Sequence, residues 1–231
     1  HNVAADLVGR VHRERLLRLT GLYTHFATAD EADKSCALSQ LDNFRGVLDT
    51  CRTDDEMTIH AANSAAAIDL PASHFDMIRP GIAVYGYQPS GGMQTVLPLR
   101  PCLRLRSLLM QIKDLSPGAS VGYGLTHTFD RGSRVGLVPV GYADGYPRNL
   151  SGKVSMRIGG VDVPVCGRVA MDQVIVDLTE VPSARMGDEV EVISPDSSAP
   201  HSVEGLAGLA GTIPYEITCG LGGRIRLSVL E

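Results

Sequence analysis

The sequence predicts an α/β region followed by a mainly β domain, and three observations predict this order. Up to about residue 88, helical and strand-like patterns alternate, which is typical of parallel βαβ units. From about residue 95, short apolar runs separated by Gly and Pro turns follow, which favours a β sandwich or barrel. With 231 residues, 44% of them hydrophobic, the chain is long enough to bury a core in each part.

The first elements of the chain are a helix and a short buried strand. A helix is expected over residues 4–18, followed by the strand GLYTHF at 21–26. The densest basic stretch, at 10–19, is interpreted as the solvated face of an amphipathic helix. Its apolar positions are Val11, Leu16, Leu17 and Leu19.

The next segments continue the strand–helix alternation. Residues 30–52 have helical spacing, and Asp30 is a candidate cap at the start of that helix. Its apolar side is formed by Leu38, Leu41, Phe44, Val47 and Leu48. A strand over 57–62 and a short helix over 64–71, ended by Pro71, are expected next. Residues 77–87 are expected to form a strand with a turn inside it.

The second part is predicted to consist of short strands after a linker at 89–98. The expected strand-rich runs are LRLRSLLMQIKDL (103–115), SRVGLVPVGYA (133–143), KVSMRIGGVDVPVCG (153–167), DQVIVDL (172–178), DEVEVIS (188–194) and RIRLSVL (224–230). A lone short helix is expected over 203–211. Tyr215 is interpreted by default as a tyrosine within a β-sheet.

Composition excludes several classes of function. A net charge of −5 and the lack of a basic run argue against a nucleic-acid partner. No apolar run is long enough to cross a bilayer and no signal peptide is apparent, so we expect no membrane partner and a cytoplasmic location. The five cysteines lack CxxC spacing, which favours a reducing compartment and argues against a metal site.

Polar residues follow three successive strands of the first part. His25 ends the first, His60 ends the second ahead of Asn63 and Ser64, and Arg79 follows the third. Each has an ordinary structural alternative: a core histidine, a helix N-cap, and a surface arginine at a turn. The functional interpretation is a polar site at the carboxyl ends of barrel strands, where Ser64 and the Gly81 and Ile82 amides hold a phosphate.

The β part contains further Gly- and Tyr-rich turns. Tyr123 lies in VGYG and Tyr142 in GYADGYPR, and packed tyrosines in tight turns are the strong structural alternative. A phenol has an ordinary pKa near ~10, so Tyr123 would need cationic neighbours to act as a base near neutral pH. Met171 and Asp172 lie in GRVAMDQ, where Asp172 either starts a turn or offers its N–H to a carboxylate.

Taken together and in this order, the motifs closely resemble one family. THFATADE, HAANSAA, RPGIAVYG, VGYG, GYADGYPR, GRVAMDQ and TIPYE are similar to the pattern of the pyridoxal-phosphate-dependent alanine racemases, from about residue 20 to the C-terminus. The resemblance implies an α/β plus all-β fold, with the C-terminal part of a (β/α)8 TIM barrel over 1–95 and a mainly β domain over 96–231. It also implies a homodimer with shared active sites.

The resemblance implies a pyridoxal 5'-phosphate site built by residues of both parts. The cofactor-binding residues it indicates are Ser64, Arg79, Gly81, Ile82, Tyr215, His60 and Asn63. Arg79 would face the pyridine nitrogen, where a permanent positive charge makes the ring a weaker electron sink and favours racemisation. Small residues after His60 would leave room for the cofactor phosphate.

The resemblance also implies the catalytic and substrate groups. Tyr123 would act as one of two bases from the neighbouring subunit, with His25 and Arg79 as a hydrogen-bonded line behind it that lowers the phenol pKa. The substrate-binding residues it indicates are Met171, Asp172 and Tyr142. The residues it places in the access corridor are Asp30, Arg148, Arg168 and Ile213, with Tyr123 and Tyr215 as an inner gate.

The resemblance has one gap. The family's imine lysine belongs to an upstream barrel strand, and Lys34, Lys113 and Lys153 do not match its motif. We therefore expect this chain to be a piece that holds about the last three βα units and does not racemise alanine on its own. The resemblance implies that the complete enzyme supplies D-alanine for peptidoglycan. Open alternatives are a non-catalytic dimerisation or binding module and a racemase of another small amino acid such as serine. A related decarboxylase is disfavoured, because Arg79 stands where an acid would be needed.

Overall fold

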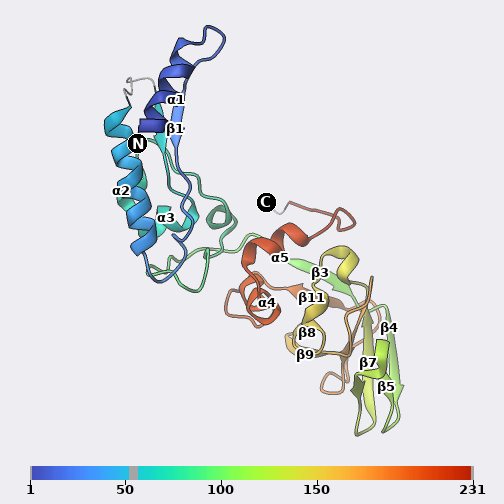
Figure 1. Cartoon of the computed structure of the whole chain (residues 1–231). Coiled ribbons are helices and arrows are strands. Elements are labelled where there is room, and N and C mark those ends of the chain that lie inside the picture. The colour runs from blue at the N-terminus through green and yellow to red at the C-terminus, as the bar shows by residue number, and fades with distance from the viewer. Residues whose placement is uncertain (1, 52–56, 230–231) are drawn as a thin grey trace. The chain divides into compact units, whose positions relative to one another are not determined.

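The computed structural model describes residues 2–51 and 57–229. The chain divides into two compact units, residues 1–99 and 100–231, which are described separately (Figure 1). Within the described residues no helix is long and apolar enough to cross a membrane.

The first unit is built from parallel βα units (Figure 1). Strand β1 (Gly21–Tyr23) pairs in parallel with β2 (Thr58–His60), with Tyr23 opposite His60. Met77 forms a further parallel bridge with His60, so three chain segments run the same way. Their carboxyl ends therefore lie at one edge, which confirms the predicted barrel portion.

The described residues of this unit include three α-helices, α1 (Asn2–Arg13), α2 (Ser35–Thr50) and α3 (Ser64–Asp69), and the last two each follow a strand. Phe26, Leu41 and Phe44 form the core with the small side chains of Ala61, Ala62, Ala65 and Ala66. Alanines at the ends of β2 and the start of α3 thus contribute to packing, and they keep the backbone close to its neighbours.

The first helix is shorter than the sequence pattern predicts. Helix α1 ends at Arg13, not at residue 18, and a turn follows in which Glu14 N–H donates to the Val11 carbonyl. Leu16 and Leu17 are 97% and 59% exposed, so they do not belong to a packed apolar face. The chain has to turn here to enter β1, and this overrides the helical spacing of residues 10–19. The strand is also less buried than predicted, because Tyr23 is exposed.

The start of α2 differs from the prediction in its cap. Asp30 does not cap the helix: the N-cap position is Lys34, whose side chain makes no capping hydrogen bond, and in the turn before it Asp33 Oδ1 accepts from Ser35 N–H at 2.9 Å. Leu38, expected on the apolar side, is 47% exposed, whereas Leu41 and Phe44 are buried as predicted. The predicted end of this helix at residue 52 lies outside the described residues.

Helix α3 follows the prediction, and the segment after it does not. Asn63 caps α3, its Oδ1 accepting from Ala66 N–H at 3.0 Å. A 3-10 turn, η1 (Pro71–Ser73), starts at the proline that was predicted to end the helix. Residues 77–87 are not a strand: only Met77 bridges, and η2 (Ile82–Tyr85) is a 3-10 turn.

A buried ion pair joins α2, α3 and the end of this unit. Lys34 Nζ lies 2.8 Å from Asp69 Oδ2, with side-chain exposures of 7% and 0%. Lys34 also donates to the Ala29 carbonyl at 2.7 Å. Asp69 accepts from the backbone N–H groups of Gln94 and Thr95, both at 2.9 Å. Together these bonds fix the segment around residue 94 to α3 and to the loop before α2.

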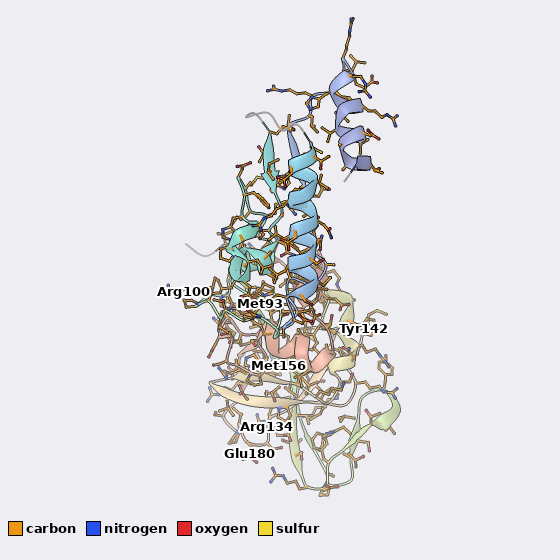
Figure 2. All side chains as sticks on the ribbon, turned by 60° about the vertical axis from the view of Figure 1, so that its left-hand side comes forward. Met93, Arg100, Arg134, Tyr142, Met156 and Glu180 are labelled. Atoms are coloured by element: carbon orange, nitrogen blue, oxygen red, sulfur yellow. The ribbon has the colours of Figure 1, made fainter. Side chains whose placement is uncertain are left out.

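The second unit is a curled seven-stranded antiparallel sheet, in the order β3-β11-β8-β9-β10-β7-β4. Its strands are β3 (Leu105–Leu108), β4 (Gln111–Leu115), β7 (Ser133–Val138), β8 (Ser155–Ile158), β9 (Val161–Cys166), β10 (Val174–Asp177) and β11 (Glu189–Ile193). The two edge strands, β3 and β4, are consecutive in the chain. Between them, the Leu109 N–H donates to the Asp188 carbonyl and the Met110 N–H donates to the Leu137 carbonyl. One continuous segment therefore forms both edges of the sheet, and buried side chains such as Met156 (Figure 2) fill the interior.

A small hairpin and two helices complete this unit. The hairpin pairs β5 (Ser120–Val121) with β6 (His127–Thr128). The helix predicted over 203–211 is α4 (Val203–Ala210), but it is not alone, because α5 (Pro214–Gly220) packs against it. Two strand predictions are wrong: Tyr215 lies in α5, where Pro214 opens the helix, and residues 224–229 form no strand. Residue 230 of that run lies outside the described part.

Candidate functional site

The first unit gathers four polar groups at the carboxyl edge of its strands. Thr24 and His25 follow β1, His60 ends β2, and Arg79 comes two residues after the Met77 bridge. Arg79 N–H donates to the Ala62 carbonyl at 2.8 Å, which ties the third segment to the end of β2. The sequence prediction that these strand ends face one another is therefore met for His25, His60 and Arg79 by direct contacts.

The Arg79 guanidinium is held by backbone and side-chain acceptors. Its Nη2 donates to the Thr24 carbonyl at 2.9 Å and to the Ala61 carbonyl at 3.2 Å. The same nitrogen lies 3.2 Å from His25 Nδ1, and Nη1 contacts His60 Nδ1. No carboxylate takes part in these contacts, so the positive charge of Arg79 remains available to a ligand.

The contacts of Arg79 define the protonation of both histidines. Arginine carries five N–H donors and no acceptor, so each Nδ1 that meets it has to be an unprotonated acceptor. His25 and His60 are then neutral rings with their proton on Nε2. For His60 this agrees with its electrostatics: burial first, and the charge of Arg79 second, lower its pKa below the ordinary value.

A second cluster lies beside the first, at the start of α3. Ser64 is 2% exposed, and its Oγ accepts from Gly81 N–H at 2.7 Å and from Ala83 N–H at 3.4 Å. Both contacts use the hydroxyl as acceptor, which leaves its proton to be donated. A Cβ placed on Gly81 would lie 4.0 Å from Ser64 Oγ, so glycine keeps the space beside the hydroxyl open.

This Ser64–Gly81 cradle fits a phosphate. A hydroxyl donor, backbone N–H groups and open space next to glycine are the features of phosphate sites in loops. Ile82 is buried directly after Gly81, at the start of η2. Asn63 is used as the cap of α3, and His60 contacts Arg79, so the structure gives neither side chain a place in the cradle itself.

The loop that carries His25 is fixed to α2 by a residue that the sequence analysis missed. Gln40 Nε2 donates to the His25 carbonyl at 2.6 Å and to Thr24 Oγ1 at 3.1 Å, and its Oε1 accepts from Ala27 N–H at 3.2 Å. Asp30, further along this loop, is half-buried, and its carbonyl accepts from Ser90 Oγ. A helical glutamine gives no sequence signal for such a role.

In the second unit, Tyr123 is presented by a tight turn. It opens η3 (Tyr123–Leu125) between two glycines of positive φ, 74° at Gly122 and 75° at Gly124, and 71% of it is exposed. A Cβ on Gly124 would approach Arg168 Nη1 to 3.1 Å, so the guanidinium packs on this turn. Tyr123, Arg168, Gln173 and Ile175 are among the residues that line a cavity of about 290 Å³.

Met171 and Tyr142 are brought together by backbone bonds. Tyr142 N–H donates to the Ala170 carbonyl at 3.1 Å, and Ala143 N–H donates to the Met171 carbonyl at 2.8 Å. Glycine is required at position 141, because the Cβ of any other residue there would lie 2.4 Å from the Ala170 carbonyl oxygen. Met171 and Tyr142 are exposed, and Asp172 follows directly in the same exposed turn.

The remaining predicted residues of this unit lie on short helices. Ile213 precedes α5 and is 49% exposed, whereas Tyr215 is half-buried in the first turn of α5. Arg148 begins η5 (Arg148–Leu150) and is exposed.

Sequence reasoning missed one further residue, Tyr23. Its ring stacks on His60 with centroids 5.2 Å apart, and the Arg79 Cζ atom lies 5.2 Å from its centroid. The sequence held a signal for it, because residues 23 and 25 would share one face of the strand predicted over 21–26, although β1 itself ends at Tyr23.

Two family models match the chain. The model described as "Alanine racemase, N-terminal domain" matches residues 2–89, and "Alanine racemase, C-terminal domain" matches residues 102–229. Curated relatives include the alanine racemase of Halothermothrix orenii, 41% identical over 96% of this chain, and that of Syntrophobacter fumaroxidans, 42% identical over 89%. The chain spans 59% and 55% of the length of these two relatives.

Solved structures give the same result. An alanine racemase from the D-cycloserine producer Streptomyces lavendulae is similar with a TM-score of 0.89 and 40% identity, over 97% of this chain and 60% of that one. The alanine racemase of Bartonella henselae, solved with covalently bound pyridoxal phosphate, has a TM-score of 0.83 and 30% identity, over 96% of this chain and 59% of that one.

Proposed function

Because this chain belongs to the alanine racemase family, whose members are pyridoxal-phosphate-dependent isomerases, we propose that it carries part of the site that interconverts L-alanine and D-alanine. The observation that supports this most strongly is Arg79. Its guanidinium is fixed between two neutral histidines, at the same strand edge as the Ser64–Gly81 cradle.

In this proposal the cradle anchors the cofactor phosphate. Ser64 donates its hydroxyl proton, and the Gly81 and Ile82 amides turn toward the phosphate oxygens. Without a ligand, Gly81 N–H donates to Ser64 Oγ. When the phosphate binds, this N–H would donate to a charged phosphate oxygen, which is a stronger acceptor than the hydroxyl. Tyr215 is proposed to contribute its phenol to the same phosphate.

Arg79 is proposed to face the pyridine nitrogen. Bound pyridoxal 5'-phosphate supplies a ring that delocalises negative charge from the substrate Cα. Arg79 donates a hydrogen bond to that nitrogen but does not give up its proton, because an arginine stays charged at all ordinary pH values. His60 and the two backbone carbonyls hold the guanidinium in one orientation for this task.

Tyr123 is proposed as one of the two bases, and His25 as its partner. Since Nδ1 of His25 is used by Arg79, the proton on Nε2 is the one that His25 offers to the phenolic oxygen. A hydrogen bond to the charged form favours the phenolate, so this partner assists proton removal by Tyr123. The Met171 amide, with Asp172 and Tyr142 beside it, is proposed to hold the substrate carboxylate.

The remaining proposals concern assembly and location. We propose a homodimer in which Tyr123 serves the neighbouring subunit, and a cytoplasmic enzyme whose access corridor includes Asp30, Arg148, Arg168 and Ile213. The resemblance of the motifs supports both. Sedimentation velocity, with and without cofactor, measures the assembly state.

Two measurements test the function. The first is a fluorescence titration of the chain with pyridoxal 5'-phosphate and with pyridoxal, which lacks the phosphate. We expect tighter binding of the phosphorylated form and a loss of about tenfold in Ser64→Ala, since a hydrogen bond to a charged group contributes about 1.5 kcal/mol or more. Pyridoxal binding should be the same in both proteins.

The second measurement is D-alanine formation from L-alanine with added cofactor. It is made with this chain alone and with a polypeptide that supplies the rest of the barrel of a relative. Activity in the mixture that is lost in Tyr123→Phe supports the proposal. Equal affinity for pyridoxal and its phosphate, together with no D-alanine in either sample, would refute it.

A further inference from the structure

Tyr23 contacts Arg79 and His60 through its aromatic ring. In the pairing of β1 with β2, Tyr23 is directly opposite His60. The two rings are parallel within 1° and their centroids are 5.2 Å apart. The Arg79 Cζ atom lies 5.2 Å from the centroid of the same tyrosine ring. One side chain thus contacts both members of the Arg79–His60 pair.

The hydrogen bonds of Arg79 leave a degree of freedom that Tyr23 removes. N–H donors of a guanidinium point outward within its plane, so the acceptors Thr24, Ala61 and the two histidines fix its edges. Contact with the face of the group adds resistance to tilting about such an edge. An aromatic ring attracts a cation through its quadrupole and supplies that contact.

We infer that Tyr23 is a positioning residue for Arg79, whose ring keeps the guanidinium and the His60 imidazole in the mutual orientation needed at the cofactor ring. The inference rests on the proposed function only for what Arg79 faces. The hydroxyl of Tyr23 has no part in it, because both contacts are made by the ring. A phenylalanine should therefore serve equally well.

A purely structural role for Tyr23 is the competing explanation, and the exposure of the residue argues against it. Tyr23 is 66% exposed and is absent from the apolar core beneath it, to which its neighbour Leu22 contributes. A large aromatic side chain in this position stabilises the fold little through burial. Its specific ring contacts are what a substitution would remove.

The test is the titration of the His60 ring by NMR, in the whole chain and without cofactor. Among the described residues, the charged and titratable groups around His60 include Arg79 and Tyr23, which contact its ring, His25, which shares Arg79, and Asp76, whose carboxylate accepts from Ile59 N–H next to His60. The ring nitrogen shifts report both the pKa and the tautomer. His60→Gln identifies the signal.

Three variants separate the explanations. Tyr23→Ala should raise the His60 pKa toward its ordinary value, since water reaches the ring and Arg79 moves, and the Nε2–H tautomer should lose its dominance. Tyr23→Phe should titrate like the parent chain. Tyr85→Ala removes another exposed tyrosine of the same unit and should also leave His60 unchanged. If Tyr23→Ala does not fold, Tyr23→Leu replaces it with the same expectation.

Two outcomes would overturn the inference. In the first, the pKa and tautomer of His60 stay unchanged in Tyr23→Ala. In the second, they change in Tyr23→Phe as much as in Tyr23→Ala. A cofactor titration of the same variants distinguishes this failure from failure of the proposed function. We expect pyridoxal 5'-phosphate to bind several-fold more weakly to Tyr23→Ala than to Tyr23→Phe. A chain that shows the His60 effect but never binds the cofactor keeps the positioning role and loses the racemase proposal.

Discussion

Replacing Lys34 by methionine tests the role of the buried ion pair between Lys34 and Asp69. The change removes the ammonium but keeps most of the aliphatic chain, so Asp69 remains with its side chain 0% exposed and without its counter-ion. Removing one partner of a buried pair typically destabilises a protein by about 3–5 kcal/mol. Two backbone N–H donors, from Gln94 and Thr95, still bind Asp69. We therefore expect the lower end, about 3 kcal/mol.

Hydrogen exchange of the α2 and α3 amides, read by mass spectrometry, measures this loss within the first unit. About 3 kcal/mol corresponds to a roughly 150-fold increase in the opening equilibrium. Lys113→Met is the matched control, because Lys113 is exposed on β4 in the other unit. Adding Asp69→Asn to Lys34→Met removes the unpaired charge while retaining an acceptor oxygen, and should recover part of the loss.

The same pair predicts the sign of a pH dependence. Burial alone would raise the pKa of Asp69, but hydrogen bonds from Lys34, Gln94 and Thr95 outweigh it and lower the pKa below 3.8. The stabilisation is therefore present above the unfolded pKa and is lost as pH falls through the folded one. Without Lys34 the pKa of Asp69 should rise, so the difference in free energy of unfolding between Lys34→Met and the parent chain should become smaller from about pH 7 to about pH 4. A difference below about 1 kcal/mol at neutral pH, or one that does not change with pH, would refute the reasoning.

Two further predictions concern the second unit. Gly145→Ala should lower the free energy of unfolding, measured by thermal unfolding, by at least about 3 kcal/mol, because φ is 93° and the added Cβ would lie 1.9 Å from the Gly220 oxygen. The control Gly152→Ala should lower it by only about 1 kcal/mol, because φ is 66° and no atom lies within 4 Å of the added Cβ. Similar costs for both would contradict the steric argument. Tyr146→Phe should be neutral or stabilising by about 1 kcal/mol, since the buried hydroxyl has no partner among the described residues. Burial raises the Tyr146 pKa, so the parent chain should lose stability above about pH 10 in denaturant titrations, and the variant should lose less.

Much of the fold follows from local patterns in the sequence. Alternating apolar positions place β7, β8 and β10, and small residues with a good N-cap, Asn63, place α3. Local patterns fail where tertiary contacts decide. The helical spacing after Arg13 is overridden by the turn into β1, and the alternating run at 224–229 finds no partner strand in the described sheet. Pro214 opens α5 instead of interrupting a strand.

The sequence by itself determined the family, the two structural parts and the polar residues that end three strands, because each of these is carried by residue type and spacing. Only the tertiary structure decided how those residues meet. The tautomers of His25 and His60 follow from one guanidinium that is 54 residues distant along the chain from His25. The stacking of Tyr23 and the anchoring by Gln40 come from strand register and helix packing. Such contacts join positions far apart in the chain, and no local pattern records which pairs will touch.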